Sequence, residues 1–245
     1  MKLAPILRAA RASGAIAWTA AELAVVETKM RARPEAAEDL FDREMRRWCL
    51  GLLRIAGVDL RRGGERPGPA HGPRLVIANH RSAYDIPILL TLFGGSVLSR
   101  ADIAEWPLFG YAARRAQTIF VDRDSPQSGV KAIRAIREHL QRGRTVSVFP
   151  EGTTIAGDTL RPFSGGAFAA ARGLDVEIVP VGLAYPSGCE YVEERFVDHI
   201  ANLTGRGRIP VGVCVGAPRR SGGRTQVKDL EAEVSGLVAK ARALL

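Results

Sequence analysis

The stretch LVIANHRSAYDIPILL, residues 75–90, decides the fold of this chain. It begins with apolar residues suited to a buried strand, becomes polar at Asn79, His80 and Arg81, and then turns apolar again over a longer run. A buried strand that leads through a short turn into a helix is the repeating unit of α/β proteins. The stretch therefore predicts a strand at 75–78 and a helix at 83–93.

The same alternation continues along the chain. Further candidate strands are 117–121, 145–149, 178–184, 191–196 and 211–216, and further candidate helices are 107–116, 126–142, 165–171 and 227–244. Short apolar strands that alternate with helices pair largely in parallel and are covered on both faces. We expect an α/β fold, with a mixed, largely parallel sheet flanked by helices and preceded by an N-terminal helical pair.

Composition restricts the class of protein more than its function. The chain has 245 residues, of which 46% are hydrophobic and 25% charged, and this excludes disordered, collagen-like and disulfide-scaffold proteins. Lys and Arg exceed Asp and Glu by 35 to 26, a formal net charge of +9. Such an excess suits a polyanion, an anionic membrane surface or an acidic substrate, but it also serves solubility alone.

Cysteine and histidine spacing indicates neither a metal site nor a disulfide framework. Cys49, Cys189 and Cys214 are far apart in the sequence, and the four histidines show no metal-binding spacing. We therefore expect no metal and no bound cofactor, and a reducing, cytosolic environment for the chain.

Residues 1–60 are richer in alanine and other helix-forming residues than the rest of the chain. They predict two helices, at 3–29 and 35–56. No uncharged run reaches the roughly 20 residues of a membrane-spanning helix. On the first helix, Arg8, Arg11, Glu22 and Lys29 form one narrow charged stripe on an otherwise apolar surface. Such a helix either lies in a membrane interface or packs on its own domain. Arginines among apolar positions of the second helix suit anionic lipid head groups.

The run at 61–73 is rich in Gly, Pro and Arg, and this composition predicts a connecting loop. We expect it to separate helices at 1–60, which would dock on a membrane, from an α/β domain at 61–245.

Chemistry-bearing residues follow the first strand. In α/β folds, sites gather where the carboxyl end of a strand meets a loop. If His80 lies in that turn and Asp85 in the first turn of the next helix, the carboxylate can reach Nδ1 and leave Nε2 free to accept a proton. The alternative is structural, because Ser82 and Asp85 also match a helix capping box.

Two further strand ends carry charged residues. The strand at 145–149 leads into Pro150, Glu151, Gly152 and Thr153, where a glycine allows backbone N–H groups to form an anion-binding nest and a tight turn is the plain alternative. Arg123 follows the strand at 117–121. It is suited to bind a phosphate, or to pair locally with a neighbouring aspartate.

These stretches, in this order, resemble the glycerolipid acyltransferase family. Its blocks are matched by Asn79, His80 and Asp85, then Trp106 to Gly110, Asp122-Arg123, Phe149 to Thr153, Pro162 to Gly166 and Val179-Pro180-Val181. The resemblance covers residues 75–183. It implies the fold of that family and the transfer of an acyl group to a lysolipid hydroxyl. The acceptor that it implies first is 1-acylglycerol-3-phosphate, with phosphatidate as the product.

The resemblance also implies residue roles. His80 would be the general base and Asp85 its orienting partner, with direct attack on the thioester of acyl-CoA or acyl-carrier protein and no acyl-enzyme. Substrate-binding roles fall to a set that flanks the histidine or follows the other two strands: Asn79, Arg81, Ser82, Arg123, Glu151, Gly152 and Thr153. The residues Val179, Pro180 and Val181 would shape the acyl pocket.

Departures from the family pattern bear on the acceptor. Thr154 stands where many members carry Arg or Ser, and Arg100 stands in place of a lysine ahead of Trp106. Because a cation is missing near Glu151, lyso-ornithine lipid is an alternative acceptor. A basic module without enzymatic activity is a distant alternative.

The expected partners are a lysolipid, an acyl donor and, through residues 1–60, an anionic membrane surface. No nucleic acid is expected. The expected location is the cytoplasmic face of the cell membrane, with the protein bound peripherally or monotopically.

Overall fold

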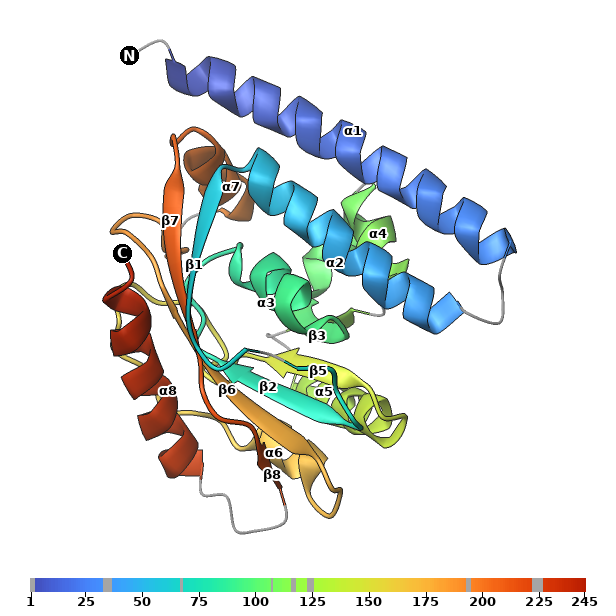
Figure 1. Ribbon diagram of the computed structural model, residues 1–245, viewed down its shortest axis with the longest axis vertical. Helices are drawn as coiled ribbons and strands as arrows, with labels where there is room; N and C mark the ends of the chain where they lie inside the picture. Colours follow the sequence, from blue (N-terminus) through green and yellow to red (C-terminus); the bar gives the residue numbers. More distant parts are fainter. Residues whose placement is uncertain are drawn as a thin grey trace.

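The computed structural model is built around one eight-stranded sheet (Figure 1). It describes residues 3–32, 37–66, 68–106, 108–115, 118–122, 126–192, 195–221 and 227–245. The strands are β1 (Val58–Gly64), β2 (Arg74–Ala78), β3 (Ser96–Arg100), β4 (Ile119–Val121), β5 (Thr145–Val148), β6 (Glu177–Ala184), β7 (Ile209–Val215) and β8 (Arg219–Arg220). Their order across the sheet is β1-β7-β6-β2-β5-β3-β4, with β8 also paired to β6. Only the β6–β7 and β6–β8 ladders among these are antiparallel, so the expected mixed, largely parallel sheet is confirmed.

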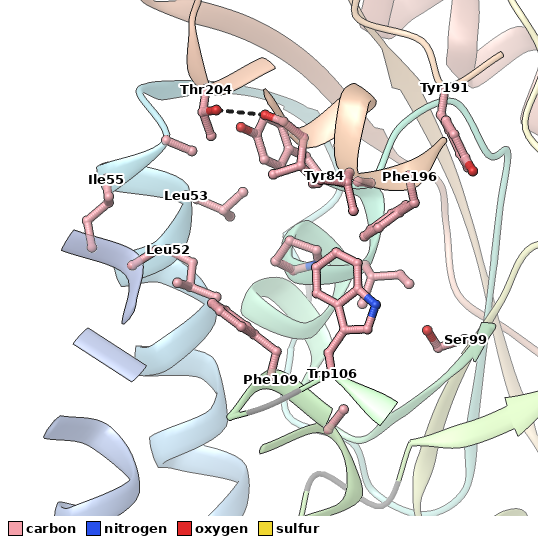
Figure 2. Close-up of a pocket in the computed structure, with 18 of the residues that line it drawn as sticks. Leu52, Leu53, Ile55, Tyr84, Ser99, Trp106, Phe109, Tyr191, Phe196 and Thr204 are labelled. Atoms are coloured by element: carbon pink, nitrogen blue, oxygen red, sulfur yellow. Dashed lines mark hydrogen bonds between the residues drawn. The ribbon is translucent and has the colours of Figure 1, made fainter. Parts of the chain in front are cut away.

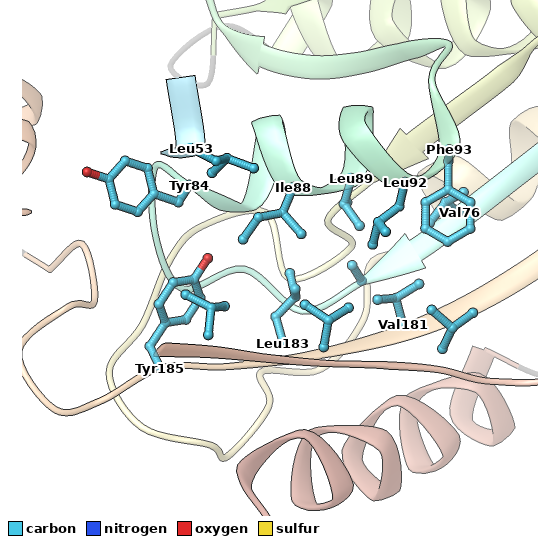
Figure 3. Close-up of a cluster of buried hydrophobic side chains, with 14 of the residues drawn as sticks. Leu53, Val76, Tyr84, Ile88, Leu89, Leu92, Phe93, Val181, Leu183 and Tyr185 are labelled. Atoms are coloured by element: carbon cyan, nitrogen blue, oxygen red, sulfur yellow. The ribbon is translucent and has the colours of Figure 1, made fainter. Parts of the chain in front are cut away.

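Helices cover both faces of the sheet. They are α1 (Leu3–Ala32), α2 (Ala37–Ile55), α3 (Asp85–Phe93), α4 (Phe109–Arg115), α5 (Pro126–Gln141), α6 (Gly166–Ala171), α7 (Phe196–Thr204) and α8 (Val227–Arg242), with a 3-10 helix, η2 (Ala101–Glu105), before α4. Successive side chains of β2 point to opposite faces of the sheet. Val76 and Ala78 pack with α3, whereas Leu75 and Ile77 pack with α5, α6 and α8. Figure 3 shows the α3 side of this core.

Several segments differ from expectation. The strand β3 and most of the helix α7 lie where no element was predicted. Residues 58–64 form β1, although most of them read as a connector, and they pair in parallel with β7 at the edge of the sheet. An edge strand contacts only one neighbour, and that leaves Arg61 and Arg62 exposed and hides the strand pattern in the sequence. The strand predicted at 191–196 is wrong, because Tyr191 and Val192 are irregular and Phe196 begins α7.

The N-terminal helices form, and the charged stripe of α1 faces the protein. Arg11 donates to the carbonyl oxygens of Thr204 and Gly207 after α7. Glu22 is buried and pairs with Arg47 of α2 at 3.0 Å, while Lys29 pairs with Glu44 at 2.6 Å. Desolvation raises the pKa of Glu22, and Arg47 opposes that effect. The charges of α1 therefore attach it to α2 and to the end of α7.

Close packing of α8 on the sheet depends on a glycine in β6. A Cβ added to Gly182 would lie 2.3 Å from the backbone of Leu237 and Val238. By contrast, Gly236 lies exposed within α8 and has open space around it. A side chain at position 182 would therefore collide with α8, whereas a side chain at position 236 would not collide with anything.

We expect Gly182→Ala to lower the free energy of unfolding by about 1–3 kcal/mol or more, because α8 must move off β6. Gly236→Ala is the matched control and should raise stability by roughly 0.5–1 kcal/mol through helix propensity. Urea denaturation of both variants checks the pair. Equal stability of Gly182→Ala and the parent protein would contradict this packing.

Candidate active site

The active-site turn lies between β2 and α3, at the carboxyl edge of the parallel strands. Since β2 pairs in parallel with both β5 and β6, the residues that follow these three strands meet at one edge. His80 follows β2, Glu151 follows β5 and Tyr185 follows β6. The topology thus gathers side chains that are up to about a hundred residues apart in the sequence.

His80 and Asp85 form a hydrogen-bonded pair. The Nδ1 atom of His80 lies 2.8 Å from Asp85 Oδ2, and Asp85 is fully buried. The imidazole stacks on the ring of Phe149 with 4.0 Å between ring centroids, which fixes the plane of the imidazole. In the part of the chain that the structure describes, no group is hydrogen-bonded to Nε2. His80 also lines the main cavity, so its free nitrogen is available to a substrate there.

The carboxylate of Asp85 also holds the backbone of the turn. Its Oδ2 accepts hydrogen bonds from the backbone N–H groups of Arg81 at 2.6 Å and Ser82 at 2.9 Å. Its Oδ1 accepts a hydrogen bond from the Tyr185 hydroxyl at 2.6 Å. These N–H groups precede α3, whose N-cap residue, Tyr84, makes no side-chain capping hydrogen bond. Asp85 therefore holds the turn before the helix and orients His80 at the same time.

Glu151 joins the turn after β5 to the turn after β2. Its Oε1 accepts hydrogen bonds from the His80 backbone N–H at 2.8 Å and from Arg81 Nη1 at 2.9 Å. Its Oε2 accepts a hydrogen bond from the Arg161 backbone N–H at 2.8 Å. All of these are protein contacts, so the geometry gives Glu151 a role in holding the two turns together.

Arg81 and Asn79 are likewise engaged with the protein. Arg81 is buried, and its guanidinium donates to the carbonyl oxygens of His80, Gly157 and Thr159. The Asn79 amide bonds both the N–H and the C=O of Leu183 in β6. These contacts fasten the active-site turn to β6 and to the loop after Glu151.

The other predicted site residues divide into three groups. Ser82 is buried and its Oγ lies 3.3 Å from His199 Nε2, while Gly152 (φ +73°) and Thr153 stand in the turn after β5. Val179, Pro180 and Val181 lie inside β6, and both valines belong to the core against α3 rather than to the cavity lining. Arg123 lies outside the described residues.

A cavity of about 500 Å³ opens beside His80. Figure 2 shows residues that line this cavity, among them Trp106, Phe109 and Phe196. It lies among α1, α2, α3, α4 and α7, and its lining is mostly apolar. One face of α7 follows it from Phe196 to Thr204, a rise of about 12 Å along the helix. Trp106 and Phe196 meet edge to face within it, at 5.3 Å between centroids. The cavity is thus long, apolar and in contact with the histidine.

Two site residues were not predicted, Tyr185 and His199. His199 is buried in α7, where its ring lies 4.9 Å from that of Tyr191 and its Nε2 accepts a hydrogen bond from the Ala83 N–H at 3.3 Å. The position of Tyr185, directly after an apolar strand, is a signal that could have marked it. Nothing local marks His199, because no element was predicted for residues 197–204 of α7.

The described residues contain neither a candidate metal site nor a candidate membrane-spanning helix. Within the described ranges, no three His, Cys, Asp or Glu side chains gather in a geometry that could hold a metal ion. None of the described helices combines the length and the apolar character needed to cross a membrane.

The comparisons with known proteins show the family of the chain. The family model described as Acyltransferase matches residues 60–184, and the chain belongs to this family. A lyso-ornithine lipid O-acyltransferase of Pseudomonas aeruginosa is 36% identical over 184 residues, which are 75% of this chain and 70% of the relative. A 1-acyl-sn-glycerol-3-phosphate acyltransferase of Neisseria gonorrhoeae is 35% identical over 138 residues, and the match spans about half of each chain, 56% and 54%.

A solved structure shares the fold over its whole length. The crystal structure of the 1-acyl-sn-glycerophosphate acyltransferase from Thermotoga maritima superposes with a TM-score of 0.73 and 20% identity. The match covers 100% of this chain and 97% of that one, so the N-terminal helices are included. The protein is therefore an acyltransferase by family and has the fold of this solved enzyme.

We expect Arg81→Lys to lower the free energy of unfolding by roughly 2–4 kcal/mol. The ammonium group of lysine cannot make the several hydrogen bonds that the buried, planar guanidinium group of Arg81 makes. Arg161→Lys is the matched control: its side chain is exposed, and its effect should stay within about 0.5 kcal/mol. Urea denaturation measures both. Similar small effects of the two substitutions would contradict the anchoring role of Arg81.

Proposed function

We propose that the protein transfers a fatty acyl group from a thioester donor, acyl-CoA or acyl-carrier protein, to the free hydroxyl of a lysolipid. The observation that carries this proposal is the His80–Asp85 pair, at 2.8 Å, on the wall of an apolar cavity. A base that faces an apolar cavity needs no nucleophile of its own when the substrate brings a hydroxyl. The cavity supplies the surface that an acyl chain requires.

In the proposed step, His80 Nε2 removes the proton of the lysolipid hydroxyl while that oxygen attacks the thioester carbonyl carbon. The imidazolium that forms is stabilised by Asp85 through Nδ1–H. The tetrahedral intermediate then collapses, the C–S bond breaks, and the leaving thiolate takes the proton back from Nε2. The products are a diacylated lipid and a free thiol, and no acyl-enzyme is formed.

Lyso-ornithine lipid is the acceptor that we propose first. Support comes from the Pseudomonas relative, whose match covers three quarters of this chain. It also comes from Thr154, an uncharged residue that lines the cavity together with His80. The Neisseria relative makes 1-acylglycerol-3-phosphate the second candidate. Incubation with labelled acyl-CoA and both lysolipids separates them by the product that becomes labelled.

His80→Ala should lower the rate of acyl transfer by roughly 10²- to 10⁴-fold, because the positioned base is lost. The matched control is His71→Ala, an exposed histidine in the loop before β2, which should keep the parent rate. Thiol release and lipid product are measured together, with circular dichroism to compare folding. If the His80→Ala variant folds and transfers acyl groups at the parent rate, His80 is not the general base.

We also propose that α1 places the enzyme on an anionic membrane. Leu3, Ile6 and Ile16 are 81%, 69% and 55% exposed. Between Ala9 and Ala24, every exposed residue of α1 is Ala, Ser or Ile. An uncharged helix face of this kind is suited to lie at the boundary of head groups and acyl chains. The same helix lines the cavity through Ala12, Ala15 and Ile16, so a lipid would have a short path to it.

The double variant Ile6→Glu/Ile16→Glu should weaken binding to anionic liposomes at least about tenfold, because burying one isoleucine is worth roughly 1.5–3 kcal/mol. Val130→Glu is the matched control, since Val130 is 60% exposed on α5. Flotation with the liposomes measures the bound fraction. If the double variant floats as well as the control, α1 is not the membrane contact.

A further inference from the structure

Tyr185 supplies a buried contact to the active-site pair. It follows β6 directly and is 1% exposed. Its hydroxyl donates a hydrogen bond to Asp85 Oδ1 at 2.6 Å. The residue stands just beyond the part of the chain that the family model matches, which ends at residue 184. Family membership therefore assigns no role to it.

The two oxygens of Asp85 have different partners. Oδ2 accepts hydrogen bonds from His80 Nδ1–H and from the backbone N–H groups of Arg81 and Ser82. The contact of Oδ1 is with the Tyr185 hydroxyl. A buried carboxylate oxygen that loses its donor carries a large desolvation penalty and favours another orientation. The tyrosine thus fixes the rotation of the carboxylate, and this rotation sets where His80 Nε2 points.

Tyr185 is itself held firmly. Its carbonyl oxygen accepts a hydrogen bond from Arg242 Nη1 of α8 at 2.6 Å, and the same guanidinium binds the Asp158 carboxylate through two hydrogen bonds. Burial raises the pKa of Tyr185 well above its ordinary value, and the charge of Asp85 raises it further. The phenol therefore keeps its proton and remains a donor.

The titratable groups around this chain of hydrogen bonds come from several segments. Tyr84, just before α3, and Cys189, in the loop after β6, interact electrostatically with Tyr185. Arg81 and Glu151 lie beside His80 and form a buried ion pair with each other at 2.9 Å. His199 lies on the other side of the turn, next to Ser82. Within this set, Tyr185 is the side chain whose hydroxyl is hydrogen-bonded to Asp85 Oδ1.

We propose that Tyr185 is a positioning residue for acyl transfer: its hydroxyl orients the Asp85 carboxylate and, through it, the imidazole of His80. The proposal rests on the proposed roles of His80 and Asp85. It extends the pair into a chain of three side chains from three segments, namely the strand end of β6, the first turn of α3 and the turn after β2.

Tyr185→Phe tests the proposal, because it deletes one oxygen and keeps the ring. We expect kcat to fall about tenfold, while KM for the lysolipid changes less than about twofold. The acidic limb of the pH profile of kcat/KM should move to higher pH. With one donor fewer, Asp85 attracts the protonated imidazole more strongly, so His80 becomes the neutral base only at higher pH. If Tyr185 only stabilised the fold, Tyr185→Phe would leave the acidic limb at the same pH.

A fluorinated tyrosine at position 185 gives the opposite test. Its hydroxyl is more acidic and a stronger donor, so the acidic limb should move to lower pH while the shape of the side chain is kept. This second variant keeps the proposal testable should Tyr185→Phe fold poorly. The downfield proton signal of His80 Nδ1–H should shift in opposite directions in the two variants.

A double-mutant cycle shows whether the effect passes through Asp85. In an Asp85→Asn background, Tyr185→Phe should change kcat less than about twofold. The control for loss of a tyrosine hydroxyl is Tyr111→Phe, since Tyr111 is 44% exposed on α4 and bonds Glu27 of α1. This control should keep the parent rate and pH profile.

The outcomes separate the two proposals. If His80→Ala is inactive but Tyr185→Phe keeps the parent kcat and pH profile, the role of Tyr185 is refuted and that of His80 stands. A full tenfold loss in the Asp85→Asn background would equally refute it. If His80→Ala is active, the proposed base itself fails.

Discussion

The buried ion pair between Arg81 and Glu151 is the contact on which the active-site geometry depends. Its atoms are 2.9 Å apart, and the two side chains are 2% and 0% exposed. Neither charge is stable in such a place without its partner. The pair joins the turn after β2 to the turn after β5, and the remaining donors of Arg81 hold the loop at Gly157 and Thr159. His80 thus sits in a turn whose backbone is fixed from both sides, and its ring is left to react.

The N-terminal helices extend the same division between buried charge and apolar surface. In α1, Glu22 and Lys29 pair with α2 and Arg11 binds the end of α7, whereas the exposed residues between Ala9 and Ala24 are uncharged. Over this stretch the helix carries its charges toward the protein and an uncharged face toward its surroundings, unlike an ordinary surface helix. It also lines the cavity that reaches His80. A single helix therefore connects the surface proposed to meet lipid with the site proposed to modify it.

The sequence predicts β2, β5, β6 and β7, most helices and the fold class, because buried strands such as 75–78 are apolar throughout. It does not reveal β1, an edge strand in which Arg61 and Gly63 break any apolar pattern, nor the short strand β3. It also misses α7, of which only Phe196 fell within a predicted strand. His80, Asp85 and Glu151 could be singled out because each stands near the end of a predicted strand. Arg81 and Asn79 were assigned to substrate, but their contacts are with the protein. Tyr185 and His199 reach the site only through tertiary packing, which no local pattern reports.

The most direct test of the central claim is the balance between thiol release and lipid product. Purified enzyme is mixed with labelled acyl-CoA, with and without lysolipid, and the intact mass of the protein is followed together with free thiol and diacylated lipid. Direct transfer from donor to acceptor predicts one thiol per acylated lipid, no burst of thiol without lysolipid and no gain of acyl mass by the protein. A stoichiometric burst of thiol without lysolipid, together with an acylated protein, would contradict the account.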